Sequence, residues 1–229
     1  MNSVALQDIL NAYKGKQLFV AIHAPQGCGK TTLSEYLYNS LSDRGYNVLV
    51  MSLDDFYYPY DIMKKKLNEY NNDLYKYRGL AGTHDIYNLN ECFRKLKFGK
   101  NTFIPIFNKS LRDGFGDVEK YKYIKKKMDI IILEGWMIGY TPQVFIDEKF
   151  TLFNNQLKKY KKLQDFFDLW ICFDTDNIDN IYKWRWCAEK DLNENEFKAF
   201  MDPYMEVYKN YVCRKKNKYT LDINRNILE

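Results

Sequence analysis

The chain has 229 residues, of which 46% are hydrophobic and 17% aromatic, so it is long and apolar enough to bury one substantial core. Its 35 basic and 30 acidic residues give a net charge of +5, a mild excess that suits small anions as well as nucleic acid and excludes neither. Five scattered cysteines without a C-x-x-C pair argue against a disulfide framework or a zinc cluster and favour a reducing compartment.

Residues 1–16 lack the apolar run of a signal peptide, and no stretch approaches the ~20 apolar residues of a membrane span. We therefore expect a cytoplasmic protein without membrane association, built as one domain over residues 1–229. Two long stretches near 58–84 and 105–118 are polar or contain glycines among charges, and we interpret them as insertions at the acceptor site. The lysine runs 64–66 and 125–127 are expected to be solvated surface.

Strands and helices alternate in the predicted order. Short apolar runs predict strands over 17–24, 46–52, 129–133 and 169–173. Apolar residues at helical spacing predict helices from 32 to the break at Gly45, over 85–97 and over 153–167. Strands separated by helices imply an α/β fold with a parallel sheet.

A phosphate-binding loop follows the first predicted strand and precedes the first predicted helix. The letters from Ala24 to Thr32 are APQGCGKTT, which match the pattern G-x-x-x-x-G-K-[ST] with alanine in place of the first glycine. In such a loop, backbone N–H groups surround the phosphate oxygens, and alanine can replace the first glycine wherever the backbone does not need a positive φ. The sequence therefore predicts an ATP site.

Each residue of the loop has an expected role. Lys30 would hold the β- and γ-phosphates, Thr31 would bind Mg²⁺ and Thr32 would support the α-phosphate. Because a thiol near a helix N-terminus has a lowered pKa, we expect Cys28 to be the most reactive cysteine and Mg-ATP to protect it. The predicted nucleotide-binding residues are Pro25, Gln26, Gly27, Cys28, Gly29, Lys30, Thr31 and Thr32.

Acidic residues stand at the ends of two predicted strands, at the edge of an open α/β sheet where ligands bind. Asp54 and Asp55 follow the second strand, and one of them could accept the proton of an attacking hydroxyl; the alternative is a pair of helix-capping acids. Glu134 ends the third strand, where we expect it to order Mg²⁺ or a water molecule bound to it.

The chain contains, in order, the segments APQGCGKTT, SLDDFYYP, RGLAGTHD, NKS, LEGWMIGY, YKWRWCAE and LDINRN. This ordered set spans nearly the whole chain and resembles the D-glycerate 3-kinases and related ATP-binding kinase-like proteins. These are a branch of the P-loop kinases near the uridine, pantothenate and phosphoribulo-kinases. The resemblance implies a P-loop fold with helices on both faces of a mainly parallel sheet. It also implies ATP and Mg²⁺ as co-substrates and a small carboxylate-bearing alcohol as acceptor.

Roles for two catalytic residues follow from the resemblance. Asp54 matches the aspartate taken as general base in the wider kinase group, which makes Asp55 the weaker candidate. Arg185 matches the lid arginine that closes over the phosphates. The alternative for Arg185 is a helix-surface arginine packed between Trp184 and Trp186.

Acceptor-site residues are implied by the segment RGLAGTHD. Arg78 would pair with a substrate carboxylate, because guanidinium suits bidentate pairing, and His84 would orient a hydroxyl beside Asp85. His84 and Asp85 could instead cap the helix that starts at residue 86. Lys109 and Arg112 remain available to meet anionic groups.

The chain departs from the D-glycerate kinases in the acceptor region. Phe107 and Asn108 stand where that family has tyrosine and aspartate, and Val118 stands where an arginine is expected. These departures leave the identity of the acceptor open. A nucleoside would need aromatic walls, which Tyr57 and its neighbours Tyr58 and Tyr60 could supply.

The function that we predict is an ATP-dependent small-molecule kinase, with D-glycerate as the expected acceptor and catalytic residues Asp54, Lys30, Glu134 and Arg185. A uridine, other nucleoside or pantothenate kinase is the first alternative. A non-catalytic ATP-binding module is the second, and the joint presence of a base, a metal-binding acid and a lid arginine argues against it. Nucleic acid is not an expected partner, and the oligomeric state does not follow from the sequence.

Overall fold

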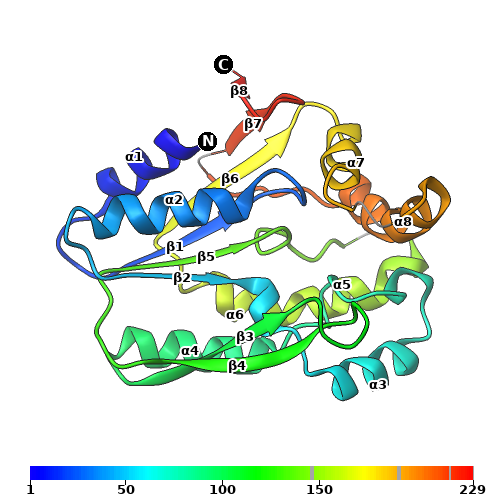
Figure 1. Ribbon diagram of the computed structural model, residues 1–229, viewed down its shortest axis with the longest axis horizontal. Helices are drawn as coiled ribbons and strands as arrows, with labels where there is room; N and C mark the ends of the chain where they lie inside the picture. Colours follow the sequence, from blue (N-terminus) through cyan, green and yellow to red (C-terminus); the bar gives the residue numbers. More distant parts are fainter. Residues whose placement is uncertain (145–146, 190–191, 217, 229) are drawn as a thin grey trace. The chain divides into compact units, whose positions relative to one another are not determined.

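The computed structural model describes residues 1–144, 147–189, 192–216 and 218–228. The chain divides into two compact units. Unit 1 comprises Met1–Val50, Asp129–Tyr140 and Phe167–Glu229, and unit 2 comprises Met51–Met128 and Thr141–Phe166. Both insertions predicted near 58–84 and 105–118 lie in unit 2 (Figure 1).

A mainly parallel sheet forms the centre of the fold, with the strand order β2-β5-β1-β6-β7-β8. β1 pairs in parallel with β5 and β6, β6 pairs in parallel with β7, and β8 closes the edge antiparallel to β7. The strands are β1 (Leu18–His23), β2 (Val48–Ser52), β5 (Ile130–Gly135), β6 (Leu169–Thr175), β7 (Lys218–Leu221) and β8 (Ile227–Leu228). The predicted α/β class and all four predicted strands are confirmed.

The core of unit 1 follows directly from its apolar runs. Every residue of β1 and β5 is buried, as expected of central parallel strands that are covered on both faces. The helices of this unit are α1 (Asn2–Ala12), α2 (Lys30–Ser42), α7 (Asp179–Trp186) and α8 (Glu194–Asn210), and α1 packs beside α2 (Figure 1). The buried leucines of α2, each worth ~1.5–3 kcal/mol on burial, are Leu33, Leu37 and Leu41.

Unit 2 contains helices and a β-hairpin. Its α-helices are α3 (Tyr60–Tyr70), α4 (Ile86–Lys97), α5 (Thr151–Leu157) and α6 (Lys161–Gln164), with 3-10 turns at Leu53–Phe56, Asp73–Tyr75, Glu148–Phe150 and Lys158–Tyr160. The predicted helix over 85–97 is confirmed as α4, with its apolar face buried. The predicted helix over 153–167 is α5 and α6 joined by a 3-10 turn.

The two insertions are more regular than the sequence suggested. The first contains α3, whose six polar or charged positions, tyrosines not counted, hid its helical period. The second covers the turn and the adjoining residues of the antiparallel pair β3 (Thr102–Asn108) and β4 (Asp117–Ile124), which has a bulge between Ile106 and Phe107. Pro105 inside β3 and the run of exposed lysines and tyrosines along β4 obscured the strand pattern.

No helix in the described part of the chain is long and apolar enough to cross a membrane.

Candidate active site

The phosphate loop connects β1 to α2 in unit 1. Ala24 is fully buried, its N–H lies 3.3 Å from the carbonyl oxygen of Gly135, and it is not among the described residues with a positive φ. Its methyl group is therefore compatible with the turn, as the sequence argument required. The left-handed positions are Gly27 and Gly29, with φ values of 75° and 97°.

Lys30 is the first residue of α2, and its ammonium donates to the carbonyl oxygen of Pro25 at 2.9 Å. Thr31 and Thr32 follow and are exposed on the first turn. The first N–H groups of a helix have no acceptor within it and carry the positive end of the helix dipole. This end of α2, with the lysine beside it, therefore has the donors and the charge that a phosphate group requires.

Glu134 lies at the end of β5, next to the strand that leads into the phosphate loop. It pairs in register with Ile22, and Gly135 pairs with His23, so β1 and β5 end together at their carboxyl ends. Glu134 is 8% exposed. A carboxylate at this position and the hydroxyl of Thr31 are hard oxygen donors of the kind that Mg²⁺ prefers, so both residues fit the metal that the sequence predicts.

The C-terminal part of unit 1 holds the loop by contacts that the sequence did not predict. The guanidinium of Arg225 donates twice to the carbonyl oxygen of Gly27, at 3.2 Å and 3.0 Å, and lies 5.5 Å from the ring centre of Trp184. Tyr208 in α8 accepts the N–H of Gln26 at 2.8 Å. The segment LDINRN was part of the family pattern, but nothing in the local sequence assigns Arg225 to the loop.

Gly27 is also required by packing. A Cβ atom at this position would lie 2.7 Å from the Cβ of Trp184 and 2.9 Å from its backbone carbonyl carbon. Trp184 is itself fixed, because its indole N–H donates to the carbonyl oxygen of Ile223 at 2.6 Å. Helix α7 and the turn before β8 thus approach the loop so closely that only glycine fits.

Arg185 occupies the next position of α7 and forms an ion pair with Glu189, one turn further along. Its guanidinium carbon lies 5.8 Å from the ring centre of Phe200. Trp184 is buried, whereas Trp186 is 41% exposed and contacts Phe197. In the structure, Arg185 is therefore paired with a carboxylate just beyond the end of α7. Its role as a lid arginine stays a prediction.

The expectation that Cys28 is the most reactive cysteine is wrong. Its side chain is fully buried, and burial raises the pKa of its thiol despite the opposing effect of the Lys30 ammonium. A neutral thiol inside the fold is a poor nucleophile. Of the five cysteines only Cys187 is exposed. The error arose because the pKa-lowering effects near a helix N-terminus are outweighed when the thiol is buried.

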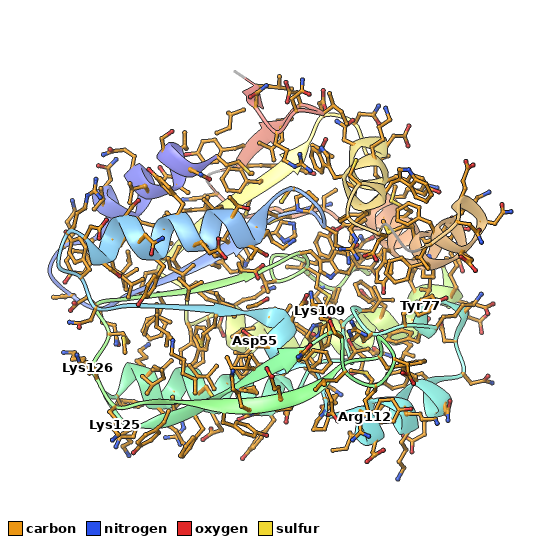
Figure 2. The ribbon with its side chains drawn as sticks, in the orientation of Figure 1. Asp55, Tyr77, Lys109, Arg112, Lys125 and Lys126 are labelled. Carbon is orange, nitrogen blue, oxygen red and sulfur yellow. The ribbon has the colours of Figure 1, made fainter. Side chains whose placement is uncertain are left out.

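In unit 2, the two neighbouring aspartates separate into different roles. Asp55 completes a capping box with Ser52, whose N–H it accepts at 3.2 Å, and it also accepts the N–H of Phe107 at 3.4 Å. Asp54 instead lies 2.6 Å from the ammonium of Lys109 on the β3–β4 hairpin, and its side chain is 28% exposed. Asp55, labelled in Figure 2, is thus the capping acid, and the role of Asp54 as the base stays a prediction.

His84 and Asp85 lie at the start of α4. Asp85 is the N-cap of this helix and accepts the N–H of Asn88 at 3.0 Å, so the capping alternative is confirmed for this residue. His84 is 2% exposed, stacks on Tyr57 with 4.4 Å between ring centres, and bonds through Nδ1 to the hydroxyl of Tyr160. Burial lowers the pKa of His84 to about 4, so this imidazole is neutral.

Tyr57 is itself 5% exposed. Its ring is covered by His84 on one side and meets Phe107 edge-on, with 5.1 Å between ring centres. This packing leaves little of Tyr57 to form a wall for a nucleoside base. In the structure, His84 and Tyr57 form an isolated antiparallel β-bridge just after the 3-10 turn that contains Asp54 and Asp55.

The arginines near the hairpin are engaged with the protein. Arg78 donates through Nη1 to the carbonyl oxygens of Gly114 and Phe115, at 2.8 Å and 2.6 Å. Arg112 has a positive φ of 55° and donates to Asp117 at 3.2 Å. Both arginines therefore hold the turn between β3 and β4 in shape.

Asn108 ends β3 and accepts the N–H of Ser110 at 2.9 Å, which starts the turn. Lys109, between them, projects its ammonium to Asp54 and is 58% exposed. Figure 2 shows Lys109 and Arg112 at the turn of the hairpin, whereas Lys125 and Lys126 lie at its other end. Among the predicted acceptor residues, Lys109 is the cation that directly contacts the candidate base.

A mainly parallel sheet with a glycine-containing phosphate loop between β1 and α2 is the P-loop fold. The sequence model of the "Phosphoribulokinase / Uridine kinase family" matches residues 19–226, and the chain belongs to this family. The enzyme is an ATP-dependent phosphotransferase with an alcohol group as acceptor.

Three similar proteins place the chain within the family. "Probable ATP-dependent kinase TDA10" of Saccharomyces cerevisiae is 33% identical over 230 residues, which cover 85% of this chain and 78% of that protein. "D-glycerate 3-kinase, chloroplastic" of Arabidopsis thaliana is 29% identical over 221 residues, covering 85% of this chain and 48% of that protein. The solved "Structure of YGR205w protein" has a TM-score of 0.87 and 30% identity, and the match covers 99% of this chain and 93% of that one.

Arg225→Ala should raise the KM for ATP about tenfold or more, because it removes two charge-assisted hydrogen bonds that hold the Gly27 carbonyl. Steady-state kinetics with varied ATP measures the effect. Arg214→Ala, an exposed arginine of the same C-terminal segment, is the control and should leave the KM unchanged. Equal KM values for ATP in wild type and Arg225→Ala would show that the loop does not depend on this contact.

Proposed function

We propose that the protein transfers the γ-phosphoryl group of ATP to the primary hydroxyl of D-glycerate, giving ADP and 3-phosphoglycerate. The observation that carries this proposal is the contact between Asp54 and Lys109, 2.6 Å apart. A hydroxy acid presents one group to be deprotonated and one carboxylate to be neutralised, and this pair offers a partner for each. The similarity to a protein named D-glycerate 3-kinase supports the same acceptor.

The nucleotide is proposed to bind at the loop of unit 1. Lys30 and the first turn of α2 would hold the phosphates, since they combine an ammonium with helix N–H groups that have no acceptor within the helix. Thr31 and Glu134 would hold Mg²⁺, which would supply charge neutralisation on the phosphate oxygens when bound. The carbonyl oxygen of Pro25, which now accepts from Lys30, would release the ammonium to the terminal phosphates.

Asp54 is proposed as the general base. As the bond forms between the hydroxyl oxygen and the γ-phosphorus, the hydroxyl proton passes to the Asp54 carboxylate, and ADP leaves with the bonding electrons. Asp55 suits this role less, because its two oxygens accept backbone N–H groups of Ser52 and Phe107. Arg185 is proposed to stabilise the charge of the transferred phosphoryl group.

Lys109 is proposed to exchange partners when the acceptor binds. In the structure its ammonium contacts Asp54, and its side chain is more than half exposed, so an exchange needs little unpacking. Moving to the glycerate carboxylate would take the lysine away from Asp54, whose carboxylate would then accept the hydroxyl proton. An exposed ion pair contributes little to stability, so the exchange is energetically accessible. Arg78 and Arg112 would keep the hairpin turn in shape around it.

Asp54→Asn should lower kcat by about 10²- to 10⁴-fold while the affinity for ATP changes only a few-fold, because the amide cannot accept the proton. Rapid-quench turnover and nucleotide titration measure the two quantities. Asp113→Asn is the matched control: the residue is exposed on the same hairpin turn, and asparagine tolerates its positive φ of 53°. Near-normal turnover in Asp54→Asn would remove Asp54 as the base.

ADP release in the presence of Mg-ATP should be at least tenfold faster with D-glycerate than with uridine or pantothenate. A coupled assay on the purified protein, with each acceptor at equal concentration, measures the ratio. Turnover of uridine or pantothenate without turnover of D-glycerate would refute the glycerate proposal and leave the kinase class intact. ATP binding without phosphorylation of any alcohol would favour a non-catalytic module.

Lys109→Gln should raise the KM for D-glycerate about tenfold or more and leave the KM for ATP within twofold, because it removes the cation proposed to neutralise the acceptor carboxylate. Arg112→Gln, whose partner in the structure is Asp117, serves as the comparison and should have the smaller effect. A KM for D-glycerate that is unchanged in Lys109→Gln would assign the carboxylate to another residue.

A further inference from the structure

Two buried cysteines of unit 1 are in direct contact. Cys172 in β6 and Cys213, which follows α8, are 41 positions apart in sequence, and their Sγ atoms are 3.0 Å apart. This separation is about 1 Å longer than a disulfide bond of ~2.05 Å, so a small movement would join them. Neither residue takes part in the proposed transfer of phosphate.

The surroundings distinguish the two sulfur atoms. The two thiols share a hydrogen bond in which either sulfur can be the donor. This contact, the backbone N–H of Lys215 and the ammonium groups of Lys215 and Lys218 lower the pKa of Cys213, although burial opposes them. Cys172 is fully buried, whereas Cys213 retains 4% exposure. Cys213 is therefore the more thiolate-like and the more accessible sulfur, and Cys172 is the thiol placed to react with it in a second step.

We propose that Cys172 and Cys213 form a reversible redox modification site, which a hydroperoxide such as hydrogen peroxide oxidises to a disulfide. The Cys213 thiolate attacks one peroxide oxygen, the O–O bond breaks, and Cys213 becomes a sulfenic acid while hydroxide leaves. Cys172 then attacks the sulfur of Cys213, the S–S bond forms, and the sulfenic hydroxyl leaves as water with the thiol proton. In total, two thiols and one hydrogen peroxide give one disulfide and two waters.

The two cysteines lie on elements that contact or lead into the phosphate loop. Cys172 pairs in register with His23, the last residue of the strand before the phosphate loop. Cys213 follows α8, whose Tyr208 accepts the N–H of Gln26 in the loop. A sulfinic or sulfonic acid at Cys213 would put a bulky charge into this packed region and could not be reversed by thiols. Rapid capture by Cys172 keeps the oxidation at a reversible stage.

The test treats the folded, full-length protein with one equivalent of hydrogen peroxide and maps its cysteines by mass spectrometry. Wild type should lose two titratable thiols, yield a Cys172–Cys213 cross-linked peptide and recover both thiols with dithiothreitol. The oxidised protein should also unfold at a temperature several degrees higher, because the cross-link restricts the unfolded chain. Cys187→Ser, which removes the exposed cysteine, is the control and should form the same cross-link.

Single variants distinguish the cysteine that reacts with peroxide, Cys213, from the cysteine that then forms the disulfide, Cys172. Cys172→Ser should accumulate a sulfenic acid at Cys213 that dimedone traps, and then sulfinic acid as peroxide is increased, whereas wild type should not. Cys213→Ser should leave Cys172 reduced under the same conditions. The proposal is overturned if all thiols other than Cys187 stay reduced in folded wild type, or if the cross-link that forms involves Cys187 or Cys28.

Discussion

The backbone conformation at Gly27 is the constraint on which the phosphate-binding loop of unit 1 depends. Its positive φ turns the loop, and its missing side chain lets Trp184 approach to a distance that no Cβ would permit. Its carbonyl oxygen is held by Arg225, so the peptide group cannot rotate freely. A loop that must present N–H groups to phosphate is thus fixed at Gly27 by two residues, Trp184 and Arg225, that are far from it in sequence.

Two adjacent aspartates in unit 2 show how one short segment serves both folding and chemistry. Asp55 satisfies backbone N–H groups of Ser52 and Phe107, and its burial raises its pKa, which suits a structural acid. This fixes the 3-10 turn and so holds Asp54 beside Lys109. Of the two adjacent carboxylates in this segment, Asp55 thus serves the turn, and Asp54 is the one proposed as the base.

The elements predicted from the sequence are those whose pattern of apolar residues lies entirely within the element itself. The apolar runs of β1 and β5 and the helical spacing in α4 require no knowledge of the rest of the chain. The β3–β4 hairpin was missed because its pairing, not its composition, defines it. Arg225 was missed because its acceptor, Gly27, is 198 positions away, and Cys28 was misjudged because burial is a property of the folded chain.

The central claim is that the enzyme phosphorylates the primary alcohol of a small hydroxy acid. It is tested most directly by the ³¹P NMR spectrum of the product formed from Mg-ATP and D-glycerate. The account predicts a new phosphomonoester signal split into a triplet by the two methylene protons of 3-phosphoglycerate. A doublet from phosphate on the secondary carbon, or ADP and inorganic phosphate as the only new signals, would contradict it.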